Sequence, residues 1–368
     1  MKKTKLGLWC VLGVWMALVA GPLWAQRVAF INPGKKDEAY WAAAAQSMQA
    51  AARSLGQPLE VFYAEREHLR ALAFARELVA RAPNERPDYV VFSNDYGTGA
   101  ELLRIFEGSG IRCFLAFSKP PPDGPVGAGR PREHFKHWVG SLEPKAEDAG
   151  YLTARALIEK GRAARAQAPD GKLHLLAIAG DRTTTASVLR NEGMRRAVRE
   201  AGDVVLVQEV YADWSREKAT EQATWLWQRH PQAKLVWAGN DLMAFGAMAA
   251  WEQRGGTPGQ TAWFSGINTS NEAMSALKSG RLAALAGGHF ITGAWALVMI
   301  HDHHHGHDFA DEGLALERSM FTLFNERTAD VFLARFGPNA EPVDYRRYSK
   351  VLNPQVRRYE FGFAQLLR

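Results

Sequence analysis

The most constraining feature of this sequence is a regular alternation of short β-branched or aromatic runs with longer segments of helical periodicity. Such alternation is typical of βα units, in which parallel strands form a sheet that is covered by helices. We therefore predict an α/β fold with parallel sheets. The predicted strands are residues 27–31, 59–63, 89–93, 112–117, 174–179, 204–210, 235–238, 262–266 and 282–287.

Length and composition indicate that these units form two domains. The chain has 368 residues, of which 47% are hydrophobic and 23% are charged, an ordinary globular composition with enough length for two lobes. Residues 120–132 are rich in proline and glycine, which predicts an exposed loop at the end of the first lobe. We expect the second lobe to open near Trp138.

The amino terminus has the pattern of a signal peptide. Lysines in the first five residues precede an apolar run over residues 6–24, and the small residue Ala25 follows. This run nearly has the length that a bilayer requires, so a membrane anchor is the alternative. We predict that residues 1–25 are cleaved, that the protein is secreted to the periplasm, and that Cys113 is then left without an internal disulfide partner.

Charge and motifs exclude several classes of function. The formal net charge is +6, but three of these charges are leader lysines, which leaves +3 for the remainder and predicts no nucleic-acid partner. The sequence has no Gly-x-Ser-x-Gly elbow, His-Glu-x-x-His helix, phosphate-binding loop or Cys-x-x-Cys pair. We therefore predict no catalytic residues, no cofactor and no enzyme activity, with an α/β enzyme as the contrasting hypothesis.

Several segments resemble the type I periplasmic binding family, which includes ribose- and galactose-binding proteins and the effector domains of the lactose-repressor group. The most specific stretch runs from Tyr-Ala-Asp-Trp-Ser-Arg at residues 211–216 to residues 236–247, where Asn-Asp and then Met-Ala-x-Gly-Ala follow a strand. Residues 28–33 and 190–194 support the resemblance. It implies two Rossmann-like lobes, joined at a hinge by multiple chain crossings, with a ligand held in the cleft between them.

The resemblance also predicts how the chain is divided. Residues 26–137 plus 289–320 are expected to form the N-terminal lobe, and residues 138–288 plus 321–368 the C-terminal lobe and tail. Crossings are expected near residues 134–140, 288–290 and 318–322. The aromatic tail either packs on the body or makes a partner surface, and we favour packing.

Candidate ligand contacts lie after the predicted strands, where parallel folds bind their ligands. Asn240 is either a contact or part of a helix cap with Asp241, and Asn32 is either a contact or a turn residue. The aromatic candidates either stack on the ligand or pack on their own helices. The predicted ligand-binding residues are Asn32, Tyr40, Trp41, Asn94, Asp95, Trp214, Asn240, Asn268 and His289.

Departures from the family pattern leave the ligand open. Val188 stands where a sugar-clamping arginine is expected, and Arg190 matches a second, usually structural, arginine. Asn268 replaces an aspartate, and a glycine followed by His289 replaces a glutamine. We predict a small polar ligand, either a sugar or a sugar-like molecule such as a modified sugar, a nucleoside or a signalling compound.

The remaining predictions concern partners and metals. Residues 301–308 contain five histidines, and His301 and His305 would share a helical face, but the cluster lacks the fixed set of four ligands that a structural metal site requires. We therefore predict no metal site. The expected partner is a membrane ABC permease, to which the ligand would be delivered, and a membrane sensor protein such as a histidine kinase or cyclase is the alternative.

Overall fold

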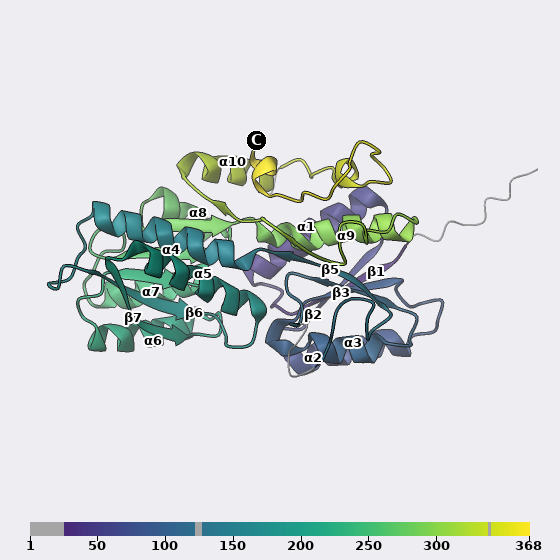
Figure 1. Cartoon of the computed structure of the whole chain (residues 1–368), viewed down its shortest axis with the longest axis horizontal. Coiled ribbons are helices and arrows are strands. Elements are labelled where there is room, and N and C mark those ends of the chain that lie inside the picture. Colours follow the sequence, from purple (N-terminus) through teal and green to yellow (C-terminus); the bar gives the residue numbers. More distant parts are fainter. Residues whose placement is uncertain (1–25, 122–126, 338–339) are drawn as a thin grey trace, which may run out of the picture.

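The computed structural model describes residues 26–121, 127–337 and 340–368, and it contains two six-stranded sheets with helices on their faces (Figure 1). The predicted leader, residues 1–25, lies outside the described residues. All nine predicted strands are present, each within two residues of its predicted ends. The apolar runs of the central strands are buried, and the two helix-covered sheets confirm the α/β class with two Rossmann-like lobes.

The first sheet has the strand order β11-β5-β4-β3-β1-β2, and all of its strand pairs are parallel. Helix α9 packs against α1 on one face, and α2 packs against α3 on the other. The elements are β1 Val28–Asn32, β2 Leu59–Tyr63, β3 Tyr89–Phe92, β4 Arg112–Ala116, β5 Trp138–Pro144, β11 Ala315–Arg318, α1 Ala39–Leu55, α2 His68–Ala80, α3 Gly99–Phe106 and α9 Thr292–His304.

The second sheet has the order β12-β10-β9-β8-β6-β7, and only the short edge strand β12 runs antiparallel among its described pairs. Helix α4 packs beside α5, and α6 beside α7. The elements are β6 Leu173–Ala179, β7 Val204–Tyr211, β8 Leu235–Ala238, β9 Trp263–Ile267, β10 Ala284–Gly287, β12 Thr322–Leu323, α4 Ala146–Ala163, α5 Thr185–Ala201, α6 Arg216–Arg229, α7 Asp241–Gln253 and α8 Asn271–Lys278.

The predicted opening of the second lobe near Trp138 is wrong. Strand β5 lies in the first sheet, where Leu115 is paired with Ser141 of β5 in parallel register. The chain therefore enters the second lobe only after Pro144, at the start of α4. It passes between the sheets again after β10 and between β11 and β12.

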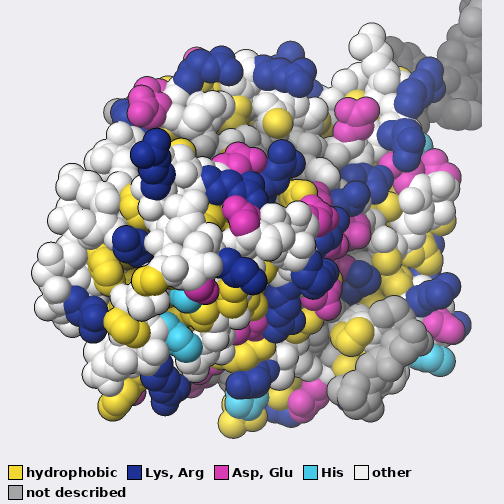
Figure 2. Space-filling model, turned by 60° about the vertical axis from the view of Figure 1, so that its left-hand side comes forward, with side chains coloured by type: hydrophobic (Ala, Val, Ile, Leu, Met, Phe, Trp, Pro, Cys, Tyr) yellow, Lys and Arg dark blue, Asp and Glu magenta, His cyan; other side chains and the backbone are white. Residues whose placement is uncertain are grey.

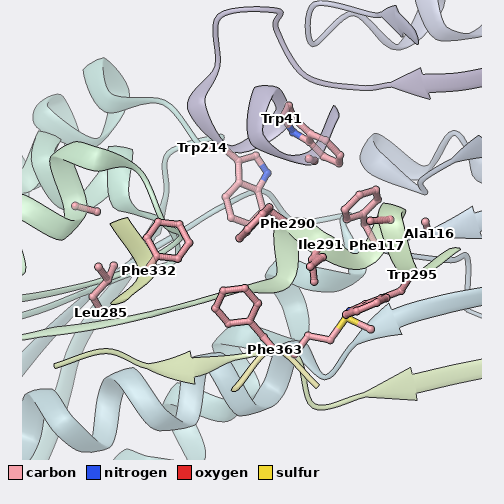
Figure 3. Packing of buried hydrophobic residues seen from close by; sticks show 14 of the residues in the cluster. Trp41, Ala116, Phe117, Trp214, Leu285, Phe290, Ile291, Trp295, Phe332 and Phe363 are labelled. Atoms are coloured by element: carbon pink, nitrogen blue, oxygen red, sulfur yellow. The ribbon is translucent and has the colours of Figure 1, made fainter. Parts of the chain in front are cut away.

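The carboxyl-terminal tail lies against both lobes (Figure 1). Its helix α10, Glu326–Phe336, packs on α8, whereas its 3-10 turn η3, Tyr345–Tyr348, packs on α1 and α9. Figure 3 shows Phe332 and Phe363 of the tail beside the segment that carries Phe290, whose ring is 5.7 Å from that of Phe363. The tail is thus part of the hydrophobic core rather than an appendage.

A buried carboxylate fixes the tail to the first lobe. Asp302, at the end of α9, is fully buried and accepts hydrogen bonds from Ser349 Oγ, from Lys350 N at 2.6 Å and from Tyr359 Oη at 2.7 Å. His301 Nδ1 donates to the same carboxylate at 3.1 Å. Burial opposes ionisation, but these donors together hold the pKa of Asp302 below its ordinary value, so the anchor is a charged group.

One face of the molecule is mixed in charge. On the face in Figure 2, lysine and arginine side chains are interspersed with aspartate and glutamate. This pattern differs from the basic stripe that is typical of nucleic-acid-binding surfaces. Among the described residues, none of the helices has the length and apolar character needed to span a membrane.

Candidate functional site

A cavity lies between the lobes, at the carboxyl ends of the parallel strands of both sheets. The space between its walls that protein atoms do not fill is about 530 Å³, and part of it is open to solvent. Its walls come from the segments that follow β1 to β5 on one side and β6 to β10 on the other. The lining residues are Glu38, Tyr40, Trp41, Arg66, Asp95, Phe117, Ser118, Pro144, Thr184, Ala186, Arg190, Trp214, Asn240, Asn268 and His289.

Aromatic rings form the wall of the cavity on the side of the first lobe. Trp41 lies edge-on to both Tyr40 and Phe117, with ring centroids 5.0 and 5.1 Å apart. Trp41 is buried, and a Cβ at Gly34 would come within 2.0 Å of its ring, so Trp41 supports the wall from behind. Tyr40 is half-buried, and its ring stacks on His289 at 4.7 Å. Burial raises the pKa of Tyr40, so it presents a neutral phenol.

A charged cluster adjoins these rings. Arg66 donates to Glu38 from Nε at 2.9 Å, and its Nη1 lies 3.9 Å from Asp95 Oδ1. Asp95 is buried and accepts from Ser93 Oγ at 2.5 Å. Burial raises the pKa of Asp95 against the opposing effect of Arg66. Glu38 and Asp95 thus carry carboxylate oxygens at the cavity wall, and such oxygens accept hydrogen bonds from ligand hydroxyls.

Arg190 lies in the cavity wall on the side of the second lobe, and its hydrogen-bond partners are a carbonyl and a histidine rather than a carboxylate. Nη1 donates to the carbonyl of Gly239 at 2.7 Å, and Nη2 lies 2.9 Å from His289 Nε2. Within the described ranges no carboxylate pairs with Arg190, and its Nε is buried without a hydrogen-bond partner. Burial lowers the pKa of Arg190 to about 10, so it remains a cation at neutral pH.

The tautomer of His289 follows from this contact. An arginine can only donate, so Nε2 of His289 accepts and the ring proton is on Nδ1. Burial, followed by the charge of Arg190, lowers the pKa of His289 well below its ordinary value. His289 is therefore a neutral ring between Tyr40 and Phe321, whose centroids lie 4.7 and 4.5 Å from its own.

Trp214 closes the cavity from the second lobe, after β7. The residue is 9% exposed, and its ring packs on Gly180, where a Cβ would come within 2.3 Å of the indole. The indole Nε1 donates to Asp181 Oδ2 at 2.7 Å. The guanidinium of Arg190 lies 5.5 Å from the ring centroid, a cation–π distance. Trp214 therefore belongs to both the cavity wall and the core.

The two predicted asparagines of the second lobe line the cavity but have local partners. Asn240 caps α7 by accepting from Met243 N at 2.8 Å, and it donates to the carbonyl of Trp214 at 3.3 Å. Asn268 donates from Nδ2 to the buried carboxylate of Asp241 at 2.8 Å. This bond uses one of the two N–H groups of the Asn268 amide and leaves the second N–H and Oδ1 for other partners.

Asn32 and Asn94 lie outside the cavity lining. Asn32 is fully buried, accepts from Gly34 N at 3.0 Å and donates to the carbonyl of Trp41 at 3.1 Å, which is the turn role of the two alternatives. Asn94 accepts from Gly99 N at 2.9 Å. The structure therefore brings together seven of the nine predicted residues: Tyr40, Trp41, Asp95, Trp214, Asn240, Asn268 and His289.

Two lining residues that sequence reasoning missed lie just after strands of the structure. Arg66 comes three residues after β2, and Phe117 directly follows β4. Arg190 was interpreted as structural, yet it lines the cavity. A search for charged and aromatic side chains within a few residues of each strand end would have included Arg66 and Phe117.

The histidine cluster at the end of α9 makes packing contacts. His303 Nδ1 lies 2.7 Å from Tyr89 Oη, and the rings of His301 and His305 stack at 4.3 Å. Among the residues that the structure describes, no three or more His, Cys, Asp or Glu side chains lie together in a way that could hold a metal ion.

Comparison with known proteins connects this geometry to a family. The family described as periplasmic binding protein domain matches residues 28–306. A solved structure of a periplasmic sugar-binding protein from Pseudomonas fluorescens is 39% identical, has a TM-score of 0.82 and covers 93% of this chain and 100% of that chain.

Curated relatives are more distant. The D-apiose import binding protein of Paraburkholderia graminis is 23% identical over 272 residues, which are 71% of this chain and 79% of that protein. The D-allose-binding periplasmic protein of Escherichia coli is 32% identical over 107 residues, and this match spans about a third of that protein's length, 34%. The family match covers most of the described chain, and the Pseudomonas structure is matched over its full length. The chain therefore belongs to the periplasmic binding proteins, which confirms the resemblance found in its sequence.

Proposed function

We propose that this protein captures a monosaccharide in the cavity between its lobes and delivers it to an ABC importer in the membrane. The observation that carries the proposal is the pairing of aromatic rings with hydrogen-bonding groups around one cavity between the lobes. Tyr40 and Trp214 offer ring surface to the C–H face of a sugar, whereas Asp95, Arg190 and Asn268 offer hydrogen-bonding groups to its hydroxyls.

The charges of the cavity favour a neutral ligand. Arg66 lies between Glu38 and Asp95, so these three groups carry one net negative charge, which offsets the charge of Arg190 across the cavity. A ligand with its own full charge would leave the site unbalanced in a buried setting, which is costly. A polyhydroxylated neutral molecule uses donors and acceptors of both walls.

The relatives support the sugar class and the import role. The 39% identical Pseudomonas protein is named as sugar-binding, and the P. graminis relative as an import binding protein for D-apiose. We propose that this chain, likewise, is exported to the periplasm, binds its ligand without converting it, and uses a membrane permease as partner.

A thermal-shift panel tests this proposal. D-Allose, D-ribose, D-apiose, other pentoses and hexoses, nucleosides and sugar acids are added to the purified protein, since a ligand of the native state raises its melting temperature by mass action. We expect a neutral aldose to give the largest rise and to be recovered unchanged by NMR after incubation. A rise with nucleosides or sugar acids alone would overturn the proposed class, and conversion of the sugar would overturn the binding role.

A further inference from the structure

Asp181 begins the turn after β6, and its two carboxylate oxygens serve different parts of the site. Oδ1 accepts from Thr183 N at 2.8 Å, from Thr183 Oγ1 at 2.9 Å and from Thr184 N at 2.7 Å. Oδ2 accepts from the indole Nε1 of Trp214 at 2.7 Å. Burial opposes ionisation, but these hydrogen bonds lower the pKa of Asp181, so it is a carboxylate at neutral pH.

The turn that Oδ1 organises contacts the first lobe. Thr184 Oγ1 accepts from Tyr96 N at 3.5 Å, and Thr185 Oγ1 donates to the carbonyl of Lys119 at 3.1 Å. Tyr96 and Lys119 follow β3 and β4 of the first sheet, so both contacts cross from one lobe to the other. Thr184 also lines the cavity, which places these contacts at its rim.

The group that Oδ2 organises is an aromatic ring on a strained backbone. Trp214 has φ +63° and Asp213 has φ +48°, a left-handed conformation that bulky residues rarely adopt. Such conformations persist where the surroundings hold them, and here Asn240 holds the Trp214 carbonyl while Asp181 holds its indole. The direction of the ring in the cavity therefore depends on Asp181.

From these contacts we infer that Asp181 is a positioning residue, which couples the orientation of Trp214 to the contacts of Thr184 and Thr185 that close the lobes. The role rests on the proposed function, because it concerns the same cavity. When a sugar stacks on the ring of Trp214, the Asp181 carboxylate also holds the turn that carries Thr184 and Thr185, so that their contacts with the first lobe can form. Such a link between two sites is a coupling free energy, and a change at Asp181 must affect both.

One substitution distinguishes the role of Asp181 Oδ2 from that of Oδ1. Asp181→Asn keeps an acceptor for the Thr183 and Thr184 donors, but its amide nitrogen cannot accept from the indole of Trp214. Trp214→Phe is the reciprocal change, since it keeps an aromatic ring and removes the N–H. Asp170→Asn is the matched control, because Asp170 is an exposed carboxylate of the same lobe that pairs with His174.

The first part of the test is an NMR measurement without sugar. In TROSY spectra of the ligand-free protein, the indole N–H signal of Trp214 is assigned by its loss in Trp214→Phe. We expect Asp181→Asn to shift that indole signal and also the amide signal of Tyr96 in the other lobe, while Asp170→Asn shifts neither. An unchanged Tyr96 amide in Asp181→Asn would overturn the coupling. If Asp181→Asn does not fold, Trp214→Phe decides, because it must then shift the Tyr96 amide.

The second arm measures affinity by calorimetry with D-allose, D-ribose and D-apiose. We expect Asp181→Asn to weaken binding about tenfold and the double variant with Trp214→Phe to bind no more weakly than Trp214→Phe alone. Additive losses would mean that Asp181 acts without the indole, which would overturn the positioning role. If the wild type binds none of these sugars or of the wider panel, the proposed function fails, while the spectra still decide the coupling.

Discussion

Arg190 Nη2 lies 2.9 Å from His289 Nε2, a contact that joins helix α5 of the second lobe to the segment that leaves β10. The histidine must be neutral to accept this hydrogen bond. The cavity therefore contains a buried cation that forms no ion pair with a carboxylate among the described residues, and its Nε has no hydrogen-bond partner.

Replacing this cation tests its role. We expect Arg190→Met to weaken sugar binding by about 2 kcal/mol, because the hydrogen bonds of a charged donor are lost and the apolar part of the side chain is kept. Arg199→Met, at an exposed position of the same helix, is the matched control and should bind as the wild type does. Calorimetry measures both. Equal affinity of Arg190→Met and Arg199→Met would show that the guanidinium does not contact the sugar.

The neutral state of His289 predicts a pH dependence of stability. Its pKa lies well below 6.5 in the native state, whereas the unfolded chain takes up a proton near pH 6.5. Below that pH the unfolded state binds more protons, so this group lowers the free energy of unfolding by up to about 1.4 kcal/mol per pH unit as pH falls. His289→Gln, which can still accept from Arg190, should show a shallower loss between about pH 6.5 and 5. Urea unfolding across this range measures the difference, and identical slopes for the two proteins would contradict it.

The sequence predicted nine of the twelve strands among the described residues, and the general place of the site, for a clear physical reason. Strands such as β2 and β8 are apolar runs bounded by turn residues, and a ligand site at their carboxyl ends follows from parallel pairing. The sheet to which a strand belongs depends on which other strand pairs with it in three dimensions. For this reason β5, which contains Gly140 and ends at Pro144, was assigned to the wrong lobe.

The hydrogen-bond partners of the polar side chains also could not be predicted from the sequence. Asn268 was expected as a ligand contact, and the structure shows that one of its two amide N–H groups donates to Asp241, 27 positions earlier in the chain. Asn32 and Asn94 were expected in the cavity, but each satisfies backbone groups of a turn beside it. A polar residue after a strand can stabilise a turn or cap a helix as readily as it can bind a ligand. Only its contacts in the structure distinguish these roles.

This contact of Asn268 changes what its substitution should do. Asn268→Asp would place a second carboxylate against Asp241, whose pKa burial already raises. Two adjacent buried carboxylates cannot both ionise without cost, so one of them should keep its proton to a higher pH than usual. We expect the variant to lose stability relative to the wild type at pH 7.5 and to regain part of it by pH 5. Denaturant unfolding at the two values checks this, and a deficit independent of pH would contradict it.

The buried anchor of the tail predicts a large effect on folding. Asp302→Asn cannot accept from all of Ser349, Lys350 and Tyr359, so buried donors lose their acceptor. We expect a loss of about 3 kcal/mol in the free energy of unfolding. Asp330→Asn, which removes an exposed ion pair with Lys278, is the control and should cost less than about 1 kcal/mol. Equal losses in the two variants would show that the tail is not fastened by Asp302.

Closure around the ligand follows from the position of the cavity. Tyr40 and Asp95 lie on one lobe, and Trp214 and Asn268 on the other, so a sugar can touch all four only when the lobes come together. Small-angle X-ray scattering with and without the sugar that gives the largest thermal shift is the most direct measurement of this claim. We predict a smaller radius of gyration at saturating sugar for the wild type. An unchanged radius of gyration, with calorimetry showing the sugar bound, would contradict capture between the lobes.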